Sequence, residues 1–135
     1  MNVATLELCK ELYELSGWAE TEWYRHSLTG TMIAGKDKIY RGSDIPAYDL
    51  GYLLRKLQLV DIAFTMAGNA QGFYAVRLDF AHDRGWYCGL INLSSVTGQY
   101  ADTPEDAACK LAIELFKQGI LTKGIDVVAT DKDLK

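Results

Sequence analysis

Residues 102–119, DTPEDAACKLAIELFKQG, carry the signals for both ends of one helix. Thr103 can cap the first turn, and Pro104 suits the first helical position. Asp106 stands where the acid of a capping box would stand, and Gly119 supplies a left-handed stop. The apolar residues recur at helical spacing, so we predict an amphipathic helix over 104–118. Small alanines on its apolar face would let this helix sit close to a sheet.

A second helix is predicted over residues 4–16, where apolar side chains return every three or four positions. Thr5 is a plausible N-cap and Gly17 a plausible left-handed end. Acidic and basic residues occupy the opposite side of this helix. The pattern is typical of a helix that buries one face against the rest of a domain.

A third helix is predicted over residues 44–57, with Ser43 or Asp44 as its cap and Pro46 in its first turn. Leucines at helical spacing follow. Gly51 inside this segment costs about 1 kcal/mol relative to alanine. We expect another backbone or an aromatic ring to approach the helix closely there.

The remaining segments favour strands joined by short turns. Residues 20–42 are predicted to form a hairpin with a long irregular loop, because aromatic residues cluster at 23–24 and glycines follow. The other predicted strands cover 60–66, 74–80, 86–93, 96–100 and 124–129. The chain is therefore expected to be one α+β domain over 1–135, with residues 130–135 frayed. Its sheet would be an antiparallel meander of about four to six strands, with three helices mainly on one face.

The composition limits the possible functions. The formal net charge of −4 argues against a general nucleic-acid coat, which needs a local excess of Lys and Arg. The N-terminus lacks a basic segment followed by an apolar run, and no apolar stretch is long enough to span a membrane, so a cytoplasmic protein is expected. Cys9, Cys88 and Cys109 form no CxxC pair, which predicts buried free thiols and no metal site.

The chain is rich in tyrosine and tryptophan, and several of these residues have an arginine nearby in the sequence. Large aromatics are often buried in a core, but they are also enriched at protein interfaces. We predict a non-enzymatic protein that binds a protein partner through an aromatic-rich surface, and a homo-oligomer is expected. The alternative is a nucleotide or nucleic-acid binder that stacks bases on aromatic and arginine side chains. The candidate binding residues are Trp23, Tyr24, Arg25, Tyr48, Tyr52, Arg55 and Trp86.

A second alternative is a small hydrolase that uses His26 or His82, the only histidines. The run from His82 to Gly85 is more typical of a polar turn between strands. Cys88 and His82 could act as nucleophile and base only if the fold brought them together. No catalytic residue, metal ligand or cofactor site is therefore predicted.

Two segments, AYDLGYLLRKL at 47–57 and the TPEDAA helix that ends in GIL at 103–121, resemble small uncharacterised proteins encoded by bacteriophages and prophages. LYELSGW at 12–18 fits the same group. In that group a proline often follows the leucine of the first segment, whereas this chain has Gln58. The resemblance implies a phage or mobile-element accessory protein that acts inside a bacterial host, so the predicted partner would be a host or phage protein.

Overall fold

The computed structural model describes residues 2–26, 31–34, 44–58, 76–90 and 97–121. These residues form two three-stranded antiparallel sheets, of order β2-β1-β3 and β4-β5-β6, and three helices. In chain order the elements are α1 (Leu6–Ser16), β1 (Trp23–His26), β2 (Met32–Ala34), β3 (Asp44–Ala47), α2 (Leu50–Leu57), β4 (Val76–Ala81), β5 (Gly85–Leu90), β6 (Gln99–Ala101) and α4 (Pro104–Lys117). The α+β class predicted from the sequence is confirmed.

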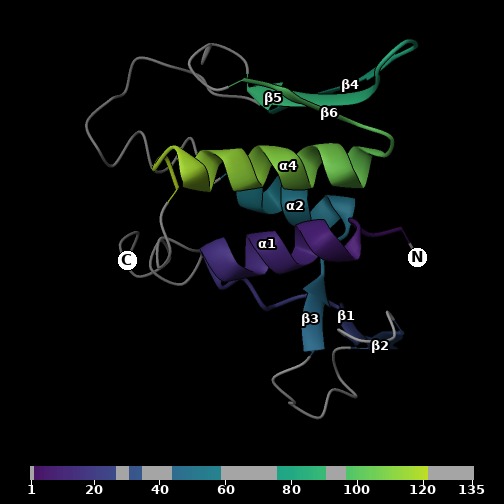
Figure 1. Cartoon of the computed structure of the whole chain (residues 1–135), viewed down its shortest axis with the longest axis vertical. Coiled ribbons are helices and arrows are strands. Elements are labelled where there is room, and N and C mark those ends of the chain that lie inside the picture. The colour runs from purple at the N-terminus through teal and green to yellow at the C-terminus, as the bar shows by residue number, and fades with distance from the viewer. Residues whose placement is uncertain (1, 27–30, 35–43, 59–75, 91–96, 122–135) are drawn as a thin grey trace.

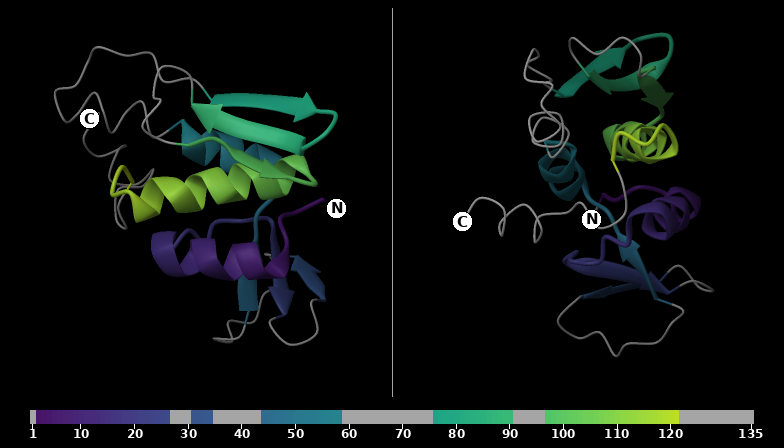
Figure 2. Two further views of the ribbon diagram at one scale, coloured as in Figure 1. Left: turned by 45° about the horizontal axis from the view of Figure 1, so that its top comes forward. Right: turned by 90° about the vertical axis from the view of Figure 1, so that its left-hand side faces the viewer.

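Helix α4 lies at the centre of the fold (Figure 1). It packs against β5 and β6 on one side and against α1 and α2 on the other, and α1 in turn packs against β3. Figure 2 shows the same layers from two other directions, with the two sheets at opposite ends of the molecule. The sequence predicts a single meander covered on one face. The described residues instead form two small sheets separated by helices.

The sequence of α4 explains this division. The three consecutive residues Ala107, Ala108 and Cys109 are fully buried, and so are Leu111 and Ala112 one turn later. A helix that is apolar on nearly every side must be covered on nearly every side. Consequently α4 fills the space between layers.

The helix ends largely follow the prediction. Thr103 Oγ1 accepts a hydrogen bond from the Asp106 N–H at 3.2 Å, and Gly17 and Gly119 adopt positive φ angles of 70° and 76°. Thr5 occupies the N-cap position of α1 without a side-chain cap bond. The Asp106 carboxylate does not complete a capping box and instead accepts the Thr5 N–H.

The predicted helix over 44–57 is wrong in its first part. Residues 44–47 form β3, which pairs antiparallel with β1, and α2 begins only at Leu50. Asp49, rather than residue 43 or 44, caps α2 by accepting the Tyr52 N–H at 2.8 Å. Pro46 fits both patterns, because the edge of a sheet tolerates a missing N–H as well as a first helical turn does.

The described residues give no support to the expectation for Gly51. Within them, a Cβ at this position would meet only polar side-chain atoms, the Arg55 Nη1 at 3.3 Å and the Asp49 Oδ1 at 3.5 Å. Gly51 is exposed, and no described backbone or ring packs on it. Nothing in the described packing requires a glycine here.

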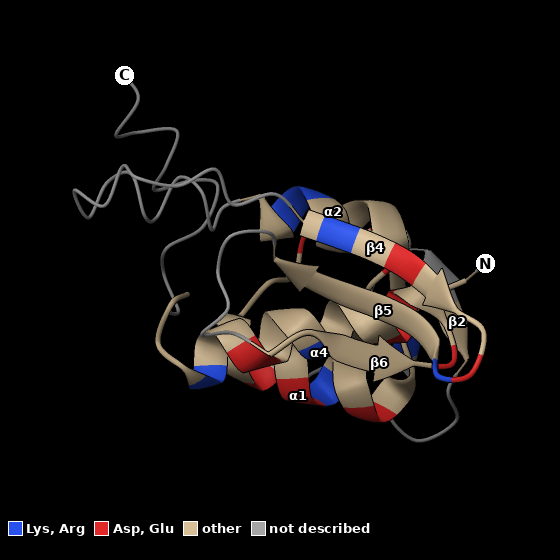
Figure 3. Ribbon diagram, turned by 90° about the horizontal axis from the view of Figure 1, so that it is seen from above, with Lys and Arg blue, Asp and Glu red and all other residues tan. Residues whose placement is uncertain are grey.

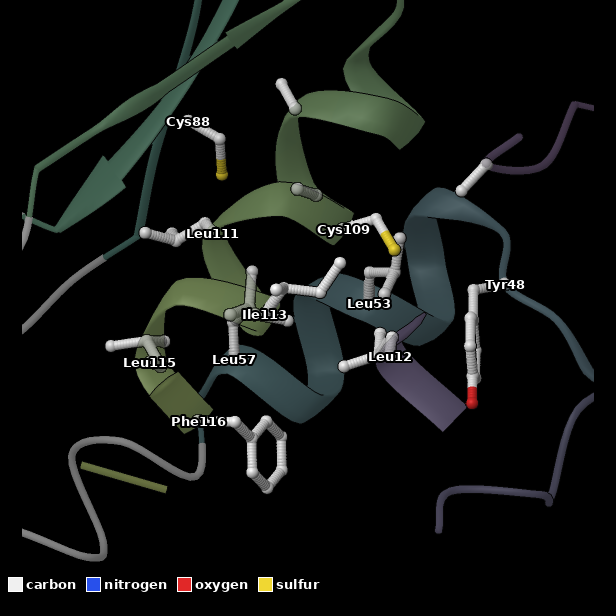
Figure 4. Packing of buried hydrophobic residues seen from close by; sticks show 14 of the residues in the cluster. Leu12, Tyr48, Leu53, Leu57, Cys88, Cys109, Leu111, Ile113, Leu115 and Phe116 are labelled. Atoms are coloured by element: carbon white, nitrogen blue, oxygen red, sulfur yellow. The ribbon is translucent and has the colours of Figure 1, made fainter. Parts of the chain in front are cut away.

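The main core lies where α1, α2 and α4 meet (Figure 4). Leu12, Leu53, Leu57, Leu111 and Leu115 are fully buried. All three cysteines are buried and free, as predicted. Figure 4 shows Cys88 pointing from the second sheet toward α4.

The other strand predictions are confirmed in part. The segments predicted over 74–80, 86–93 and 96–100 correspond to β4, β5 and β6 where they are described. The strand predictions over 60–66 and 124–129, and the fraying of 130–135, lie outside the described residues. No helix in the described ranges is long and apolar enough to cross a membrane.

Candidate functional site

Three of the seven predicted binding residues lie in the interior. Tyr24, Tyr48 and Tyr52 are 4%, 0% and 6% exposed, so they offer no face to a partner in this structure. The Tyr48 hydroxyl donates to the Trp18 carbonyl at 2.6 Å, and the Tyr52 hydroxyl donates to Glu20 at 3.1 Å. Burial raises the pKa of both Tyr48 and Tyr52, which keeps them protonated and suits them to the core.

The other four predicted residues divide into two groups. Arg25 on β1 and Trp86 on β5 are distant in sequence, yet they line one cavity of about 350 Å³ beside the N-terminus of α4. Trp23 is partly exposed on β1, and Arg55 is exposed on α2. Among the described residues, neither Trp23 nor Arg55 lines this cavity.

A different aromatic surface lies on the outer face of the second sheet. Cys88 and Leu90 of β5 belong to the core, so the alternation of a strand turns Tyr87 to the opposite face. Tyr87 pairs across the ladder with Tyr100 of β6, and their ring centroids are 5.1 Å apart. We use the name outer sheet face for the surface formed by Arg77, Asp79, Ala81, Tyr87 and Tyr100.

Two glycines leave room for the Tyr87 ring to lie on this face. A Cβ at Gly89 would lie 2.3 Å from the Tyr87 hydroxyl, and a Cβ at Gly98 would lie 2.2 Å from the ring. The ring therefore occupies the space that side chains at these two positions would need. Glycine in a strand often marks the close approach of another group, and here that group is Tyr87.

The outer sheet face surrounds a hollow of about 530 Å³, whose lining also includes Phe80. Phe80 and Tyr100 are 53% and 38% exposed, which places them among the few large apolar side chains open to solvent in the described part of the chain. Arg77 forms an ion pair with Asp79, and the Arg84 guanidinium lies 5.4 Å from the Tyr100 ring centroid. Figure 3 shows charges of both signs on β4 and in the turn that follows it.

The hydrolase alternative gains no support from the geometry of Cys88 and His82. Cys88 is fully buried on the core side of β5, whereas His82 is exposed in the turn and packs edge-on against Phe80 at 5.3 Å. Burial raises the pKa of Cys88 to about 12, which disfavours the thiolate that nucleophilic attack requires. The described residues include no cluster of three His, Cys, Asp or Glu side chains that could hold a metal ion.

The binding residues predicted from the sequence include Trp86 but neither Tyr87 nor Tyr100. A signal for them was present, because a strand that places Cys88 inside must place Tyr87 and Gly89 on the other face. Glycine beside tyrosine on one sheet face then indicates a ring lying over the glycine. The pairing of Tyr87 with Tyr100 depends on the register of β6, which the sequence alone does not give.

No protein-family model matches the chain, and neither a curated protein nor a solved structure matches it.

Proposed function

We propose that this protein is a non-enzymatic binding protein that captures a protein partner on its outer sheet face. The observation that carries the proposal is the pair Tyr87 and Tyr100, in contact on the side of the sheet that faces away from α4. Tyrosine combines a large apolar area with a hydroxyl and few rotatable bonds, which suits it to the centre of an interface. In keeping with the phage-like segments of the sequence, the partner would be a host or phage protein.

The charges around the two tyrosines favour a protein over a nucleic acid. Arg77 is neutralised by Asp79, and Arg84 stands next to Asp83 in the turn. Binding to phosphates needs an excess of positive charge that this face lacks. An aromatic centre with mixed charges at its rim is typical of protein interfaces.

The test compares two tyrosines of nearly equal exposure. Tyr100 is 38% exposed on the outer sheet face, and Tyr13 is 37% exposed on α1. Wild type, Tyr100→Ser and Tyr13→Ser would each be used to capture partners from a bacterial lysate, with quantitative mass spectrometry. A candidate partner would then be purified and its Kd measured.

We expect Tyr100→Ser to weaken the purified complex about thirtyfold, the effect of losing a central interface residue worth about 2 kcal/mol. Tyr13→Ser should leave the Kd unchanged. Equal Kd values for Tyr100→Ser and wild type would refute the proposed face. If the partner is a second copy of the chain, native mass spectrometry would show an oligomer in wild type and a monomer in Tyr100→Ser.

The nucleotide-binding alternative has one supporting observation, the Arg84 guanidinium over the Tyr100 ring. Arginine and tyrosine in this arrangement can stack with a base. Fluorescence anisotropy with single-stranded oligonucleotides at increasing salt tests it. Tight binding that weakens steeply with salt and is lost in Tyr100→Ser would favour this alternative over a protein partner.

A further inference from the structure

A second site lies away from the outer sheet face, in the cavity of about 350 Å³ that Arg25 and Trp86 line. Its walls come from the N-terminal segment, β1, β5 and the start of α4. It is therefore formed by strands of the two separate sheets beside the start of α4. Four of its lining residues carry the chemistry that matters here: Arg25, Trp86, Asp102 and Glu105.

Glu105 is a buried acid without a partner. It is 8% exposed, and among the described residues no hydrogen bond or ion pair joins its carboxylate. The next acid along α4, Asp106, is by contrast engaged by the Thr5 N–H at 2.7 Å. A buried carboxylate is costly unless a cation or hydrogen-bond donor compensates it. Glu105 lines the cavity, so a ligand there can supply that compensation.

Arg25 brings a positive charge to the same cavity. One of its guanidinium nitrogens donates to the Ala4 carbonyl at 3.4 Å, which leaves most of its donors for other groups. In the described structure no ion pair links Arg25 to Glu105 or to Asp102, although all three line one cavity. A cation and a buried anion thus face a shared volume without neutralising each other.

We propose that this cavity binds a small zwitterion. Its ammonium group pairs with Glu105, its carboxylate pairs with Arg25, and its apolar part packs on the Trp86 ring. A simple cation would meet repulsion from Arg25, and a simple anion would leave Glu105 uncompensated. A molecule carrying both charges satisfies both side chains, with Asp102 as a second acceptor at the exposed side. This inference is independent of the protein partner proposed above, because none of these four residues belongs to the outer sheet face.

The experiment follows the indole N–H signal of Trp86 in the nuclear magnetic resonance spectrum of the full chain, assigned with Trp86→Phe. The probes are glycine, β-alanine, γ-aminobutyrate and ε-aminocaproate, which place the two charges at increasing separation. Each probe is compared with its methyl ester, which keeps only the ammonium, and its N-acetyl derivative, which keeps only the carboxylate. We expect saturable shifts for at least one zwitterion, with binding roughly tenfold or more tighter than for either derivative.

Two variants and a control complete the test. Glu105→Gln keeps the side-chain shape and should weaken zwitterion binding roughly tenfold or more, as should Arg25→Gln. Glu7→Gln removes an exposed acid from the first turn of α1 and should leave binding unchanged. The proposal is overturned if no zwitterion shifts the Trp86 signal, if a methyl ester binds as tightly as its parent, or if Glu105→Gln binds like wild type.

Discussion

The Asp106 carboxylate, at the start of α4, accepts a hydrogen bond from the backbone N–H of Thr5 at 2.7 Å. Thr5 is the N-cap residue of α1, and its own side chain makes no cap bond. A donor near the start of one helix is therefore satisfied by the side chain of another helix. The acid that the sequence offers for a local capping box instead fixes the position of α1 against α4.

Removing this carboxylate should destabilise the fold. We expect Asp106→Ala to lower the free energy of unfolding by about 1–2 kcal/mol, because it removes the bond to Thr5 and a negative charge from the first turn of α4. Urea denaturation measures the change. Glu14→Ala, which removes an exposed acid from α1, is the control and should fall within about 0.5 kcal/mol of wild type. Equal effects of the two substitutions would contradict this role of Asp106.

The contact between Gly98 and the Tyr87 ring can be tested with a double-mutant cycle. Gly98→Ala would place a Cβ 2.2 Å from the ring, so we expect a loss of about 1–3 kcal/mol in unfolding free energy. In the Tyr87→Ala background the same substitution should cost much less, since the space is then free. Additive effects of the two substitutions would show that the ring does not lie over Gly98.

Lys56 is a buried cation held between two rings and an acid. It is 5% exposed, its ammonium lies 5.2 Å from the Trp18 ring centroid, and it pairs with Glu20 at 3.6 Å. Glu20 is exposed and tolerates the loss of its partner, whereas Lys56 without Glu20 would be a buried charge without an acid. We expect Lys56→Met to cost less than about 1 kcal/mol and Glu20→Ala to cost more than Lys56→Met, both measured by urea denaturation. The reverse order would mean that the charge of Lys56 itself stabilises the fold.

Alkaline pH should weaken the fold through Cys88. Burial raises the pKa of this thiol from 9.0 to about 12, so the native state holds a proton that the unfolded state loses first. The contribution to stability is complete below pH 9.0 and is lost progressively as the pH rises through about 12. Above pH ~9.5 the unfolding free energy of wild type should fall about 1.4 kcal/mol per pH unit more steeply than that of Cys88→Ala. Parallel pH profiles would place Cys88 in water in the folded protein.

Elements with local signals could be predicted from the sequence. The start and end of α4 and the end of α1 are marked by cap residues and glycines, and the structure confirms them. The start of α2 could not be predicted, because Pro46 and the nearby acids suit a helix start as well as an edge strand. The choice between the two depends on pairing with β1, a contact outside the segment itself.

The candidate sites depend even more on long-range contacts. Tyr87 contacts Tyr100 only through the register of β5 and β6, and Arg25 and Trp86 line one cavity only because strands of two sheets lie beside one helix end. The burial of Glu105 could not be predicted either, since an acid in the first turn of a helix is usually exposed and stabilised by the helix dipole. The sequence does predict aromatic and arginine side chains as binding residues. Two of these, Arg25 and Trp86, line the cavity beside the start of α4.

The central position of α4 has a consequence for how the protein is made. Helices α1 and α2 and strands β5 and β6 all precede α4 in the chain, and all of them pack on it. During synthesis the parts of their apolar surfaces that α4 covers therefore stay exposed until α4 leaves the ribosome. A nascent chain that ends before Pro104 would contain core leucines and cysteines but would lack the helix on which they pack. Because exposed apolar surface makes incomplete chains prone to aggregation, we expect the core of this protein to form only once α4 has been synthesised.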